Sequence, residues 1–290
     1  MSGGRWIDET LHPDIRLSLK ADRILYEDGT GHHHLALFEN RVFGKVLVLD
    51  GAIQVTSADE FAYHEMMAHV PILAHGAVRD VMIVGGGDGG LAEEVLKHPT
   101  VERLVQVEID ASVVDFARTH FGDFNAGIFD DPRFKVEIAD GAGFVARTSQ
   151  RFDVILVDST DPQGPGAVLF TADFYRGLKR CLKPGGVAVT QCGVPFLQMS
   201  EFRSAMGNLA TVFATAGCYL VTVPTYFGGQ MTLGWAHDGD AGALQPSLAE
   251  LARRSDGLAT RYYTPAVHRA AFALPRFIAE ALTAAGGTAA

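Results

Sequence analysis

Apolar residues follow two different rhythms along the chain, and the change falls near residue 80. Beyond it, short continuous apolar runs alternate with stretches in which apolar residues recur at helical spacing. The runs are 81–84, 104–107, 154–157, 187–190 and 220–223, and the helical stretches are 90–97, 111–120, 171–182 and 199–215. A continuous apolar run is typical of a strand buried on both faces. The alternation therefore predicts an α/β fold, with a mostly parallel sheet and helices on both of its faces.

The first sixty residues have a different pattern, in which apolar and polar residues alternate over short segments. These segments are 16–20, 34–40 and 45–49, and the turn dipeptides Asp28-Gly29 and Asp50-Gly51 lie beside them. Alternation with such dipeptides is typical of antiparallel hairpins.

The two patterns predict two domains. Residues 1–58 are expected to form a small antiparallel β domain, and residues 59–290 a Rossmann-like domain. The second begins with a helical pattern over residues 60–73, which Pro71 is expected to end, since proline lacks the N–H that continues a helix.

Composition narrows the classes of partner. The 290-residue chain has a net charge of -10. Nucleic-acid binding needs a basic face, and an anionic membrane would repel this charge, so we expect neither partner. The same charge suits a cationic small substrate. Three cysteines without metal-ligand spacing indicate reduced thiols, and the first residues lack the apolar segment of an export signal, so a cytoplasmic location is expected.

A glycine-rich turn follows the first apolar run of the α/β pattern. Gly85, Gly87 and Gly89 are spaced Gly-x-Gly-x-Gly between a strand and a helix, which allows a ligand to approach the backbone. Glu108 ends the next strand, 23 residues after Gly85 (108 − 85), where an acid can accept hydrogen bonds from both ribose hydroxyls. Gly90 also completes the dinucleotide spacing, so this motif alone leaves NAD open.

Two further strand ends carry acidic residues. Asp140-Gly141 follows the strand 134–139, at the position that meets the adenine amino group in adenosyl-sulfonium enzymes. Asp158 and Asp161 follow the strand 154–157, where substrates bind in this architecture. These strand ends favour the Rossmann-like methyltransferase-type fold over a dehydrogenase.

With these residues in place, the sequence resembles the polyamine aminopropyltransferases, and among them the bacterial spermidine synthases. The resemblance runs from residue 6 to residue 275. It is carried by Trp6, Glu9-Thr10, Phe38-Glu39-Asn40, Leu49-Asp50-Gly51, Asp59-Glu60-Phe61, Tyr63-His64-Glu65, Gly85–Gly89, Val107–Asp110, Asp158–Pro165, Pro224-Thr225-Tyr226 and Ala271–Pro275.

The resemblance implies an activity and its ligands. An aminopropyl group would pass from the co-substrate decarboxylated S-adenosylmethionine to the diamine putrescine, giving spermidine and 5'-methylthioadenosine. The protein would be a homodimer or homotetramer. The implied diamine-binding residues are Tyr63, His64, Asp158, Asp161 and Tyr226. The implied residues for the nucleoside co-substrate are His33, Gly85, Gly87, Asp88, Glu108, Asp140, Gly141 and Pro165.

Within this resemblance, Asp88 would hold the ammonium of the aminopropyl chain. Its carboxylate would also repel the carboxylate of ordinary S-adenosylmethionine, at a cost of roughly 4 kcal/mol for charges about 4 Å apart. The alternative is that Asp88 caps the following helix.

Asp158 is implied as the catalytic proton acceptor. An alkylamine is about one part in a thousand free base at pH 7, so the attacking amine must lose a proton. An ordinary aspartate is a poor base, and the alternative is that Asp158 orients the amine while water or Tyr63 takes the proton. The sulfonium is already activated, so the displacement is expected to be direct and in line, without a metal. The segment 162–169 would cover the site, or it is an ordinary surface turn.

Some residues depart from the family pattern. His33 lies where the family has a glutamine that contacts the adenosyl group. His32, His33 and His34 make a poor metal site, because neighbours on a strand point to opposite faces. Cys192 is expected to be a packed thiol rather than a nucleophile.

Competing functions are an amine N-methyltransferase that uses ordinary S-adenosylmethionine, a polyamine sensor without catalysis, and a dehydrogenase. Cadaverine, agmatine and spermidine stay open as alternative acceptors.

Overall fold

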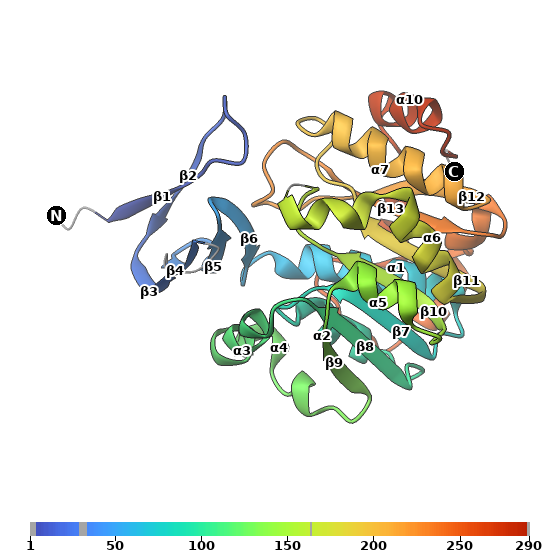
Figure 1. The fold of residues 1–290 in the computed structure, drawn as a ribbon, viewed down its shortest axis with the longest axis horizontal. Coiled ribbons are helices and arrows are strands. Elements are labelled where there is room, and N and C mark those ends of the chain that lie inside the picture. Colours follow the sequence, from blue (N-terminus) through green and yellow to red (C-terminus); the bar gives the residue numbers. More distant parts are fainter. Residues whose placement is uncertain (1–3, 29–33, 163, 289–290) are drawn as a thin grey trace. The chain divides into compact units, whose positions relative to one another are not determined.

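The computed structural model describes residues 4–28, 34–162 and 164–288, and the side chain of Pro165 lies outside that description. The chain divides into two compact units (Figure 1). One contains residues 1–61 and 223–227, and the other contains residues 62–222 and 228–290.

The first unit is built of antiparallel strands. β1 pairs with β2, and a second sheet has the order β3-β4-β5-β6. The strands are β1 (Arg5–Glu9), β2 (Leu17–Ala21), β3 (Arg23–Asp28), β4 (Leu35–Asn40), β5 (Gly44–Leu49) and β6 (Ala52–Thr56). Their inward side chains, including Phe38, Val46 and Val48, form a small apolar core. This confirms the predicted N-terminal antiparallel β structure.

A two-residue turn joins β5 to β6. Asp50 and Gly51 both have positive φ, 50° and 80°, and Leu49 pairs with Ala52 across the turn. Positive φ at both central residues is the geometry that the twist of a tight hairpin requires. The Asp-Gly dipeptide therefore forms the predicted turn. At Asp28-Gly29, Gly29 lies outside the described residues.

The second unit contains a seven-stranded sheet with the order β12-β13-β11-β10-β7-β8-β9. Its strands are β7 (Asp80–Gly85), β8 (Arg103–Glu108), β9 (Phe134–Ile138), β10 (Phe152–Asp158), β11 (Leu182–Gln191), β12 (Thr215–Val221) and β13 (Met231–His237). Neighbouring strands are parallel from β11 to β9, and β13 is antiparallel to both of its neighbours. This confirms the mostly parallel Rossmann-like sheet.

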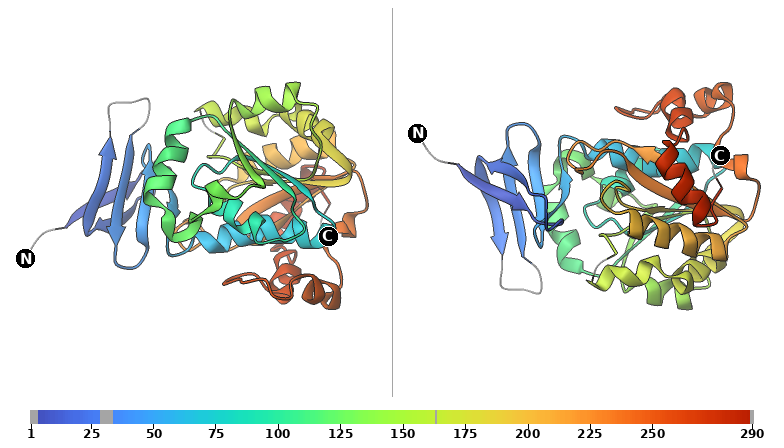
Figure 2. Two further views of the ribbon diagram at one scale, coloured as in Figure 1. Left: turned by 90° about the horizontal axis from the view of Figure 1, so that it is seen from below. Right: turned by 90° about the horizontal axis from the view of Figure 1, so that it is seen from above.

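Helices cover both faces of this sheet. They are α1 (Glu60–His75), α2 (Gly90–Leu96), α3 (Ala111–His120), α4 (Gly122–Asn125), α5 (Gly141–Arg147), α6 (Ala172–Cys181), α7 (Met199–Val212), α8 (Leu248–Arg254), α9 (Pro265–Ala271) and α10 (Arg276–Ala284). Short 3-10 helices are η1 (Ile128–Asp130), η2 (Gly164–Phe170) and η3 (Ala241–Leu244). Figure 2 shows α5, α6 and α7, coloured green to yellow, on the face opposite the cyan helix α1. One apolar core lies between the sheet and α5, α6, α7 and α10.

Three predicted boundaries are wrong. α1 continues through Pro71 to His75, because nearly all of its residues are buried and tertiary packing outweighs the hydrogen bond that proline removes. α7 ends at Val212 rather than near residue 215, and β12 takes residues 215–221 rather than 220–223. β13 was not predicted, because Thr232 and Gly234 interrupt its apolar run, although all seven of its residues are buried.

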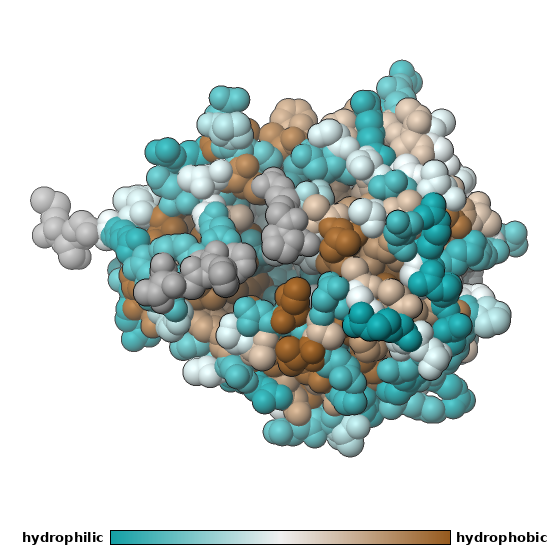
Figure 3. Space-filling view, viewed as in Figure 1, coloured by the Kyte–Doolittle hydropathy of each residue, from teal (hydrophilic) through white to brown (hydrophobic). Residues whose placement is uncertain are grey.

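The remaining features concern the surface and the thiols. On the face in Figure 3, hydrophilic side chains predominate and apolar ones are interspersed among them. In the part of the chain that the structure describes, no helix has the length and apolar character to cross a bilayer. Cys181, Cys192 and Cys218 are buried free thiols, and burial raises the pKa of Cys192 to about 12. Cys192 is therefore a packed thiol, as predicted.

Candidate active site

The acidic residues gather where the strand order of the sheet reverses. β7 is followed on one side by β8 and β9 and on the other by β10, so their carboxyl ends flank a topological switch point. Glu108 ends β8, and Asp158 ends β10 with its backbone paired to Gly85 of β7. Ligands bind at such points in open α/β sheets.

The glycine loop after β7 is tied to the end of β10. The Gly86 N–H donates to the Asp158 carbonyl oxygen at 2.9 Å. Gly85 has φ +87°, and a Cβ there would lie 2.0 Å from the same oxygen, so only glycine fits. A Cβ at Gly86 would lie 3.1 Å from Asp158 Oδ2. The Asp158 carboxylate therefore faces the glycine loop.

Asp88 is fixed within this loop. Its Oδ1 accepts from the Gly90 N–H at 2.8 Å, and its backbone oxygen accepts from Asn125 Nδ2 at 2.7 Å. Gly89, not Asp88, occupies the N-cap position of α2, although the Asp88 side chain does bond the first turn. His64 Nε2, on α1, lies 3.8 Å from Asp88 Oδ1, so α1 brings a buried imidazole to the loop.

Asp158 receives a hydrogen bond from α1. The Tyr63 hydroxyl donates to Asp158 Oδ1 at 2.8 Å. Burial, and after it the negative charge of Asp88, raises the pKa of Asp158 to about 6, although His64 and the Tyr63 hydroxyl act in the opposite direction. The structure therefore brings together Tyr63, His64, Asp88 and Asp158, and it gives Asp158 a more basic carboxylate than an ordinary aspartate.

Glu108 and Asp140 lie at the next two strand ends. Glu108 is buried, its Oε1 accepts from the Asp110 N–H at 3.0 Å, and burial raises its pKa. Asp140 is the N-cap of α5 and accepts from the Ala142 and Gly143 N–H groups. A Cβ at Gly87 would lie 3.0 Å from Glu108 Oε2, so Glu108 also faces the glycine loop. Their contacts with a nucleoside stay predictions.

Asp161 is held by residues that sequence analysis did not single out for this purpose. Gln198 Nε2 donates to Asp161 Oδ2 at 2.8 Å. Gln191 Nε2 lies 3.2 Å from the backbone oxygens of both Ser159 and Thr160. No local pattern marks these glutamines, because they reach Asp161 and its neighbours only through the tertiary fold.

Three other predicted site residues belong to the first unit or have side chains outside the described residues. Tyr226 belongs to the first unit, where its hydroxyl donates to the Gln54 backbone oxygen at 2.7 Å. His33 and the side chain of Pro165 lie outside the described residues. The segment expected to be a mobile loop or surface turn contains the 3-10 helix η2. The roles of these residues stay predictions.

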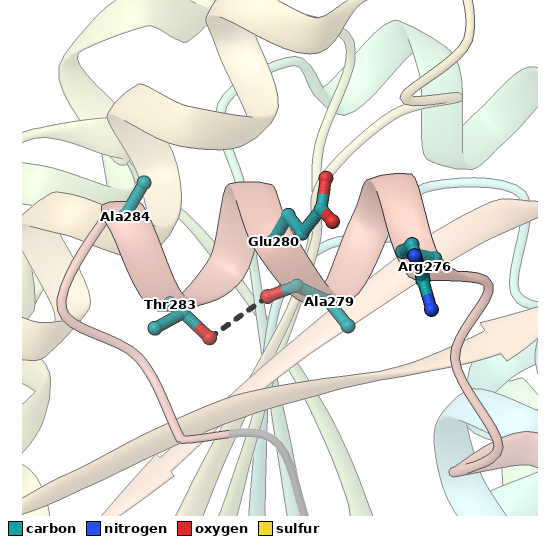
Figure 4. A pocket seen from close by; sticks show the side chains of 5 residues that line it. All are labelled: Arg276, Ala279, Glu280, Thr283 and Ala284. Carbon is teal, nitrogen blue, oxygen red and sulfur yellow. Dashed lines mark hydrogen bonds between the residues drawn. The ribbon is translucent and has the colours of Figure 1, made fainter.

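A hollow on the surface is lined by residues other than those of the carboxylate cluster. Figure 4 shows a hollow lined by Arg276, Ala279, Glu280, Thr283 and Ala284. All five belong to α10, whereas the carboxylate cluster draws on several strand ends and on α1. Within residues 4–28, 34–162 and 164–288, no group of three His, Cys, Asp or Glu side chains is arranged to hold a metal ion.

Fold and site together define a Rossmann-like α/β transferase of the methyltransferase type, with acidic side chains at the switch point. The family model described as "Spermine/spermidine synthase domain" matches residues 60–243, and the one described as "Spermidine synthase tetramerisation domain" matches residues 5–57. The chain belongs to the polyamine aminopropyltransferase family, and aminopropyl transfer is the reaction of its class.

Individual relatives agree with this assignment. The polyamine aminopropyltransferases of Escherichia fergusonii and of Escherichia coli O157:H7 are each 51% identical over 275 residues, which is 94% of this chain and 96% of theirs. A spermidine synthase crystallised with the transition state analogue AdoDATO has a TM-score of 0.90 and 37% identity, covering 97% of this chain and 95% of that one. The enzyme from Thermotoga maritima has a TM-score of 0.87 and 35% identity, covering 96% and 94%.

Proposed function

We propose that this protein is a spermidine synthase that transfers the aminopropyl group of decarboxylated S-adenosylmethionine to putrescine, releasing spermidine and 5'-methylthioadenosine. One observation carries the proposal. The Asp158 carboxylate faces the glycine loop that holds Asp88, and the charge of Asp88 contributes to the raised pKa of Asp158. Two neighbouring carboxylates suit a reaction that brings two cations together.

Asp88 is proposed to hold the donor's terminal ammonium. Its side chain is positioned by the Gly90 N–H, and a carboxylate so placed attracts an ammonium and repels a carboxylate. At an effective dielectric of about 20, like charges about 4 Å apart cost roughly 4 kcal/mol, which favours the decarboxylated donor. The relative crystallised with AdoDATO supports a donor of this kind. Glu108 and Asp140 are proposed to bind the ribose and the adenine.

Asp158 is proposed to accept the proton of the attacking amine, with Asp161 and His64 lining the diamine side. A pKa of about 6 in place of 3.8 makes the carboxylate more basic by about 2 pKa units. This lowers the free-energy cost of proton transfer from the ammonium by roughly 3 kcal/mol. Tyr63 donates a hydrogen bond to Asp158 and thereby orients it, so Tyr63 is assigned to positioning rather than to proton acceptance.

The proposed aminopropyl transfer needs no reactant other than the donor and the diamine. The neutral amine nitrogen attacks the carbon next to the sulfonium, a C–N bond forms, and the C–S bond breaks with its electron pair on sulfur. Neutral methylthioadenosine leaves, and one proton passes to Asp158 and then to solvent. The site contributes alignment and negative charge, which offsets the repulsion between donor and acceptor.

The match to a tetramerisation domain over residues 5–57 supports an oligomer, and we propose a homotetramer. Light scattering on the purified protein tests this, and a homodimer is the other expected outcome. The cytoplasmic location stays a prediction.

The function is tested with purified protein, decarboxylated or ordinary S-adenosylmethionine, and a panel of putrescine, cadaverine, agmatine and spermidine, with products identified by mass. Spermidine and methylthioadenosine are expected from the decarboxylated donor and putrescine. Methylated amines formed from the ordinary donor would instead identify a methyltransferase. Ligand binding without methylthioadenosine release would identify a sensor.

A further inference from the structure

Gln198 occupies an unusual position beside the carboxylates. It immediately precedes α7, and it is 6% exposed although its side chain is polar. Its Nε2 donates to Asp161 Oδ2 at 2.8 Å, and its Oε1 accepts from the Val194 N–H at 2.8 Å. Both ends of the amide are therefore bonded, one to the backbone and one to a predicted substrate-binding carboxylate.

The surrounding backbone fixes which way this amide points. A backbone N–H can only donate, so the oxygen of Gln198 must face Val194 and its NH2 group must face Asp161. The chain passes close by at Gly193, where φ is +69° and a Cβ would lie 2.5 Å from the Gln198 Oε1. Only glycine permits the backbone at residue 193 to come this close to the Gln198 amide.

We propose that Gln198 is a positioning residue for the diamine site: its amide holds the Asp161 carboxylate in the orientation that receives the substrate ammonium. This inference rests on the proposed function. A neutral donor fixes the carboxylate and leaves its negative charge intact, whereas a lysine or arginine in this place would neutralise it. Gln198 therefore orients Asp161 without competing with a cationic substrate.

A second glutamine, Gln191, supports the backbone of this loop, so the role of Gln198 can be distinguished from it. Gln191 contacts the backbone oxygens of Ser159 and Thr160 and accepts from the Gly193 N–H through its Oε1 at 2.9 Å. It supports the backbone, while Gln198 contacts the carboxylate of Asp161. A change at Gln198 is thus expected to affect the direction of one side chain more than the course of residues 158–161.

The test compares Gln198→Glu and Gln198→Met with the wild-type enzyme. Glutamate keeps the shape and the bond from Val194 but turns an oxygen toward the Asp161 carboxylate, whereas methionine keeps most of the volume without a donor. Losing a hydrogen bond to a charged group corresponds to roughly a 10- to 100-fold rise in the KM for putrescine. The KM for decarboxylated S-adenosylmethionine and the affinity for methylthioadenosine are expected to change less than about threefold, as for uncoupled sites.

Ser200→Ala is the matched control, because Ser200 lies in the first turn of the same helix and its hydroxyl bonds the neighbouring Glu201. It is expected to leave both KM values unchanged. If Gln198→Glu does not fold, Gln198→Met carries the test. An unchanged putrescine KM, or a parallel rise in both KM values with a lowered Tm, would overturn the inference.

A double-mutant cycle separates this inference from the proposed function. If Gln198 acts through Asp161, then Gln198→Met adds little to the loss already caused by Asp161→Asn. Fully additive losses would contradict the inference while leaving spermidine synthesis intact. A wild-type protein that forms no spermidine would instead refute the proposed function.

Discussion

Replacing Asp158 by asparagine is expected to stabilise the substrate-free protein while it removes most of the turnover. Asparagine has nearly the same shape, and its side-chain oxygen can still accept the Tyr63 hydroxyl. It lacks the negative charge that burial and Asp88 make unfavourable. The carboxylate proposed as the proton acceptor would thus be retained at a cost in stability, as is common for active sites.

The magnitude follows from the pKa of Asp158, which rises from 3.8 to about 6 in the folded protein. Each pKa unit corresponds to about 1.4 kcal/mol, so ionised Asp158 lowers the free energy of unfolding by up to about 3 kcal/mol. Because the folded state binds the proton more tightly, wild-type stability falls as pH rises from about 4 to about 6. The Asp158→Asn variant does not lose stability in this way. The difference in the free energy of unfolding between variant and wild type is therefore near zero at pH 4 and complete above pH 7.

Thermal unfolding of both proteins at pH 4.5 and pH 8, at one fixed protein concentration, measures the effect. A gain of about 3 kcal/mol corresponds to roughly 5–10 °C in Tm for a chain of this size. Asp153→Asn is the opposite control. Although burial opposes it, the Asp80 and Arg79 N–H groups and the Lys183 ammonium lower the pKa of Asp153. This control should therefore lower Tm at pH 8.

Turnover of Asp158→Asn is expected to fall by about 10²- to 10⁴-fold, the range typical for loss of a proton acceptor. The reasoning about stability fails if the variant is no more stable than the wild type at pH 8, or if the difference in Tm is the same at both pH values. A variant with near-normal turnover would remove Asp158 from the proposed mechanism.

Three further changes test neighbouring parts of the site. Asp88→Asn should weaken the binding of decarboxylated S-adenosylmethionine. The difference in binding free energy between the decarboxylated and the carboxylated form, measured by competition, should shrink by up to roughly 4 kcal/mol. An unchanged difference would refute charge selection by Asp88. Gly85→Ala should lower stability by more than about 1 kcal/mol, because φ is +87° and the added Cβ would meet the Asp158 carbonyl oxygen; an unaltered Tm would contradict this close approach. Tyr63→Phe removes one hydrogen bond to Asp158, so the pKa of Asp158 should rise further and the acidic limb of the pH–rate profile should move to higher pH. Turnover should fall by about tenfold or less. A loss as deep as that of Asp158→Asn would make Tyr63 the proton acceptor.

The parts of the fold that the sequence predicted are those governed by local rules. Continuous apolar runs located the parallel strands β7, β8, β10 and β11, and Asp50-Gly51 located a hairpin turn whose φ values only such residues adopt readily. The glycine loop and the acids at strand ends were predicted because each lies at a fixed place relative to its strand. Pro71 was wrongly predicted to end α1, because the continuation of the helix depends on burial within the whole unit. β13 was missed because its apolar run is interrupted.

The candidate site shows the same division. Asp88, Glu108, Asp140 and Asp158 could be selected from their positions in the chain. The contacts that hold the site could not, because Gln198 reaches Asp161 across 37 positions of sequence, and Tyr63 reaches Asp158 across 95. Such pairs follow from the packing of helices on the sheet, which no local pattern specifies.

The electrostatics of the candidate site favour the cationic ligands of the proposed function. Asp88, Asp158 and Glu108 lie near enough that the charges of the first and third contribute to the raised pKa of the second. The charge of His64 and the hydrogen bond from the Tyr63 hydroxyl lower that pKa, but the net change is upward. The repulsion among these carboxylates is therefore only partly offset, and a bound ammonium would relieve it further. In the proposed reaction the neutral product methylthioadenosine would not, so the charge that attracts the proposed cationic donor would no longer hold the nucleoside after the sulfonium has reacted.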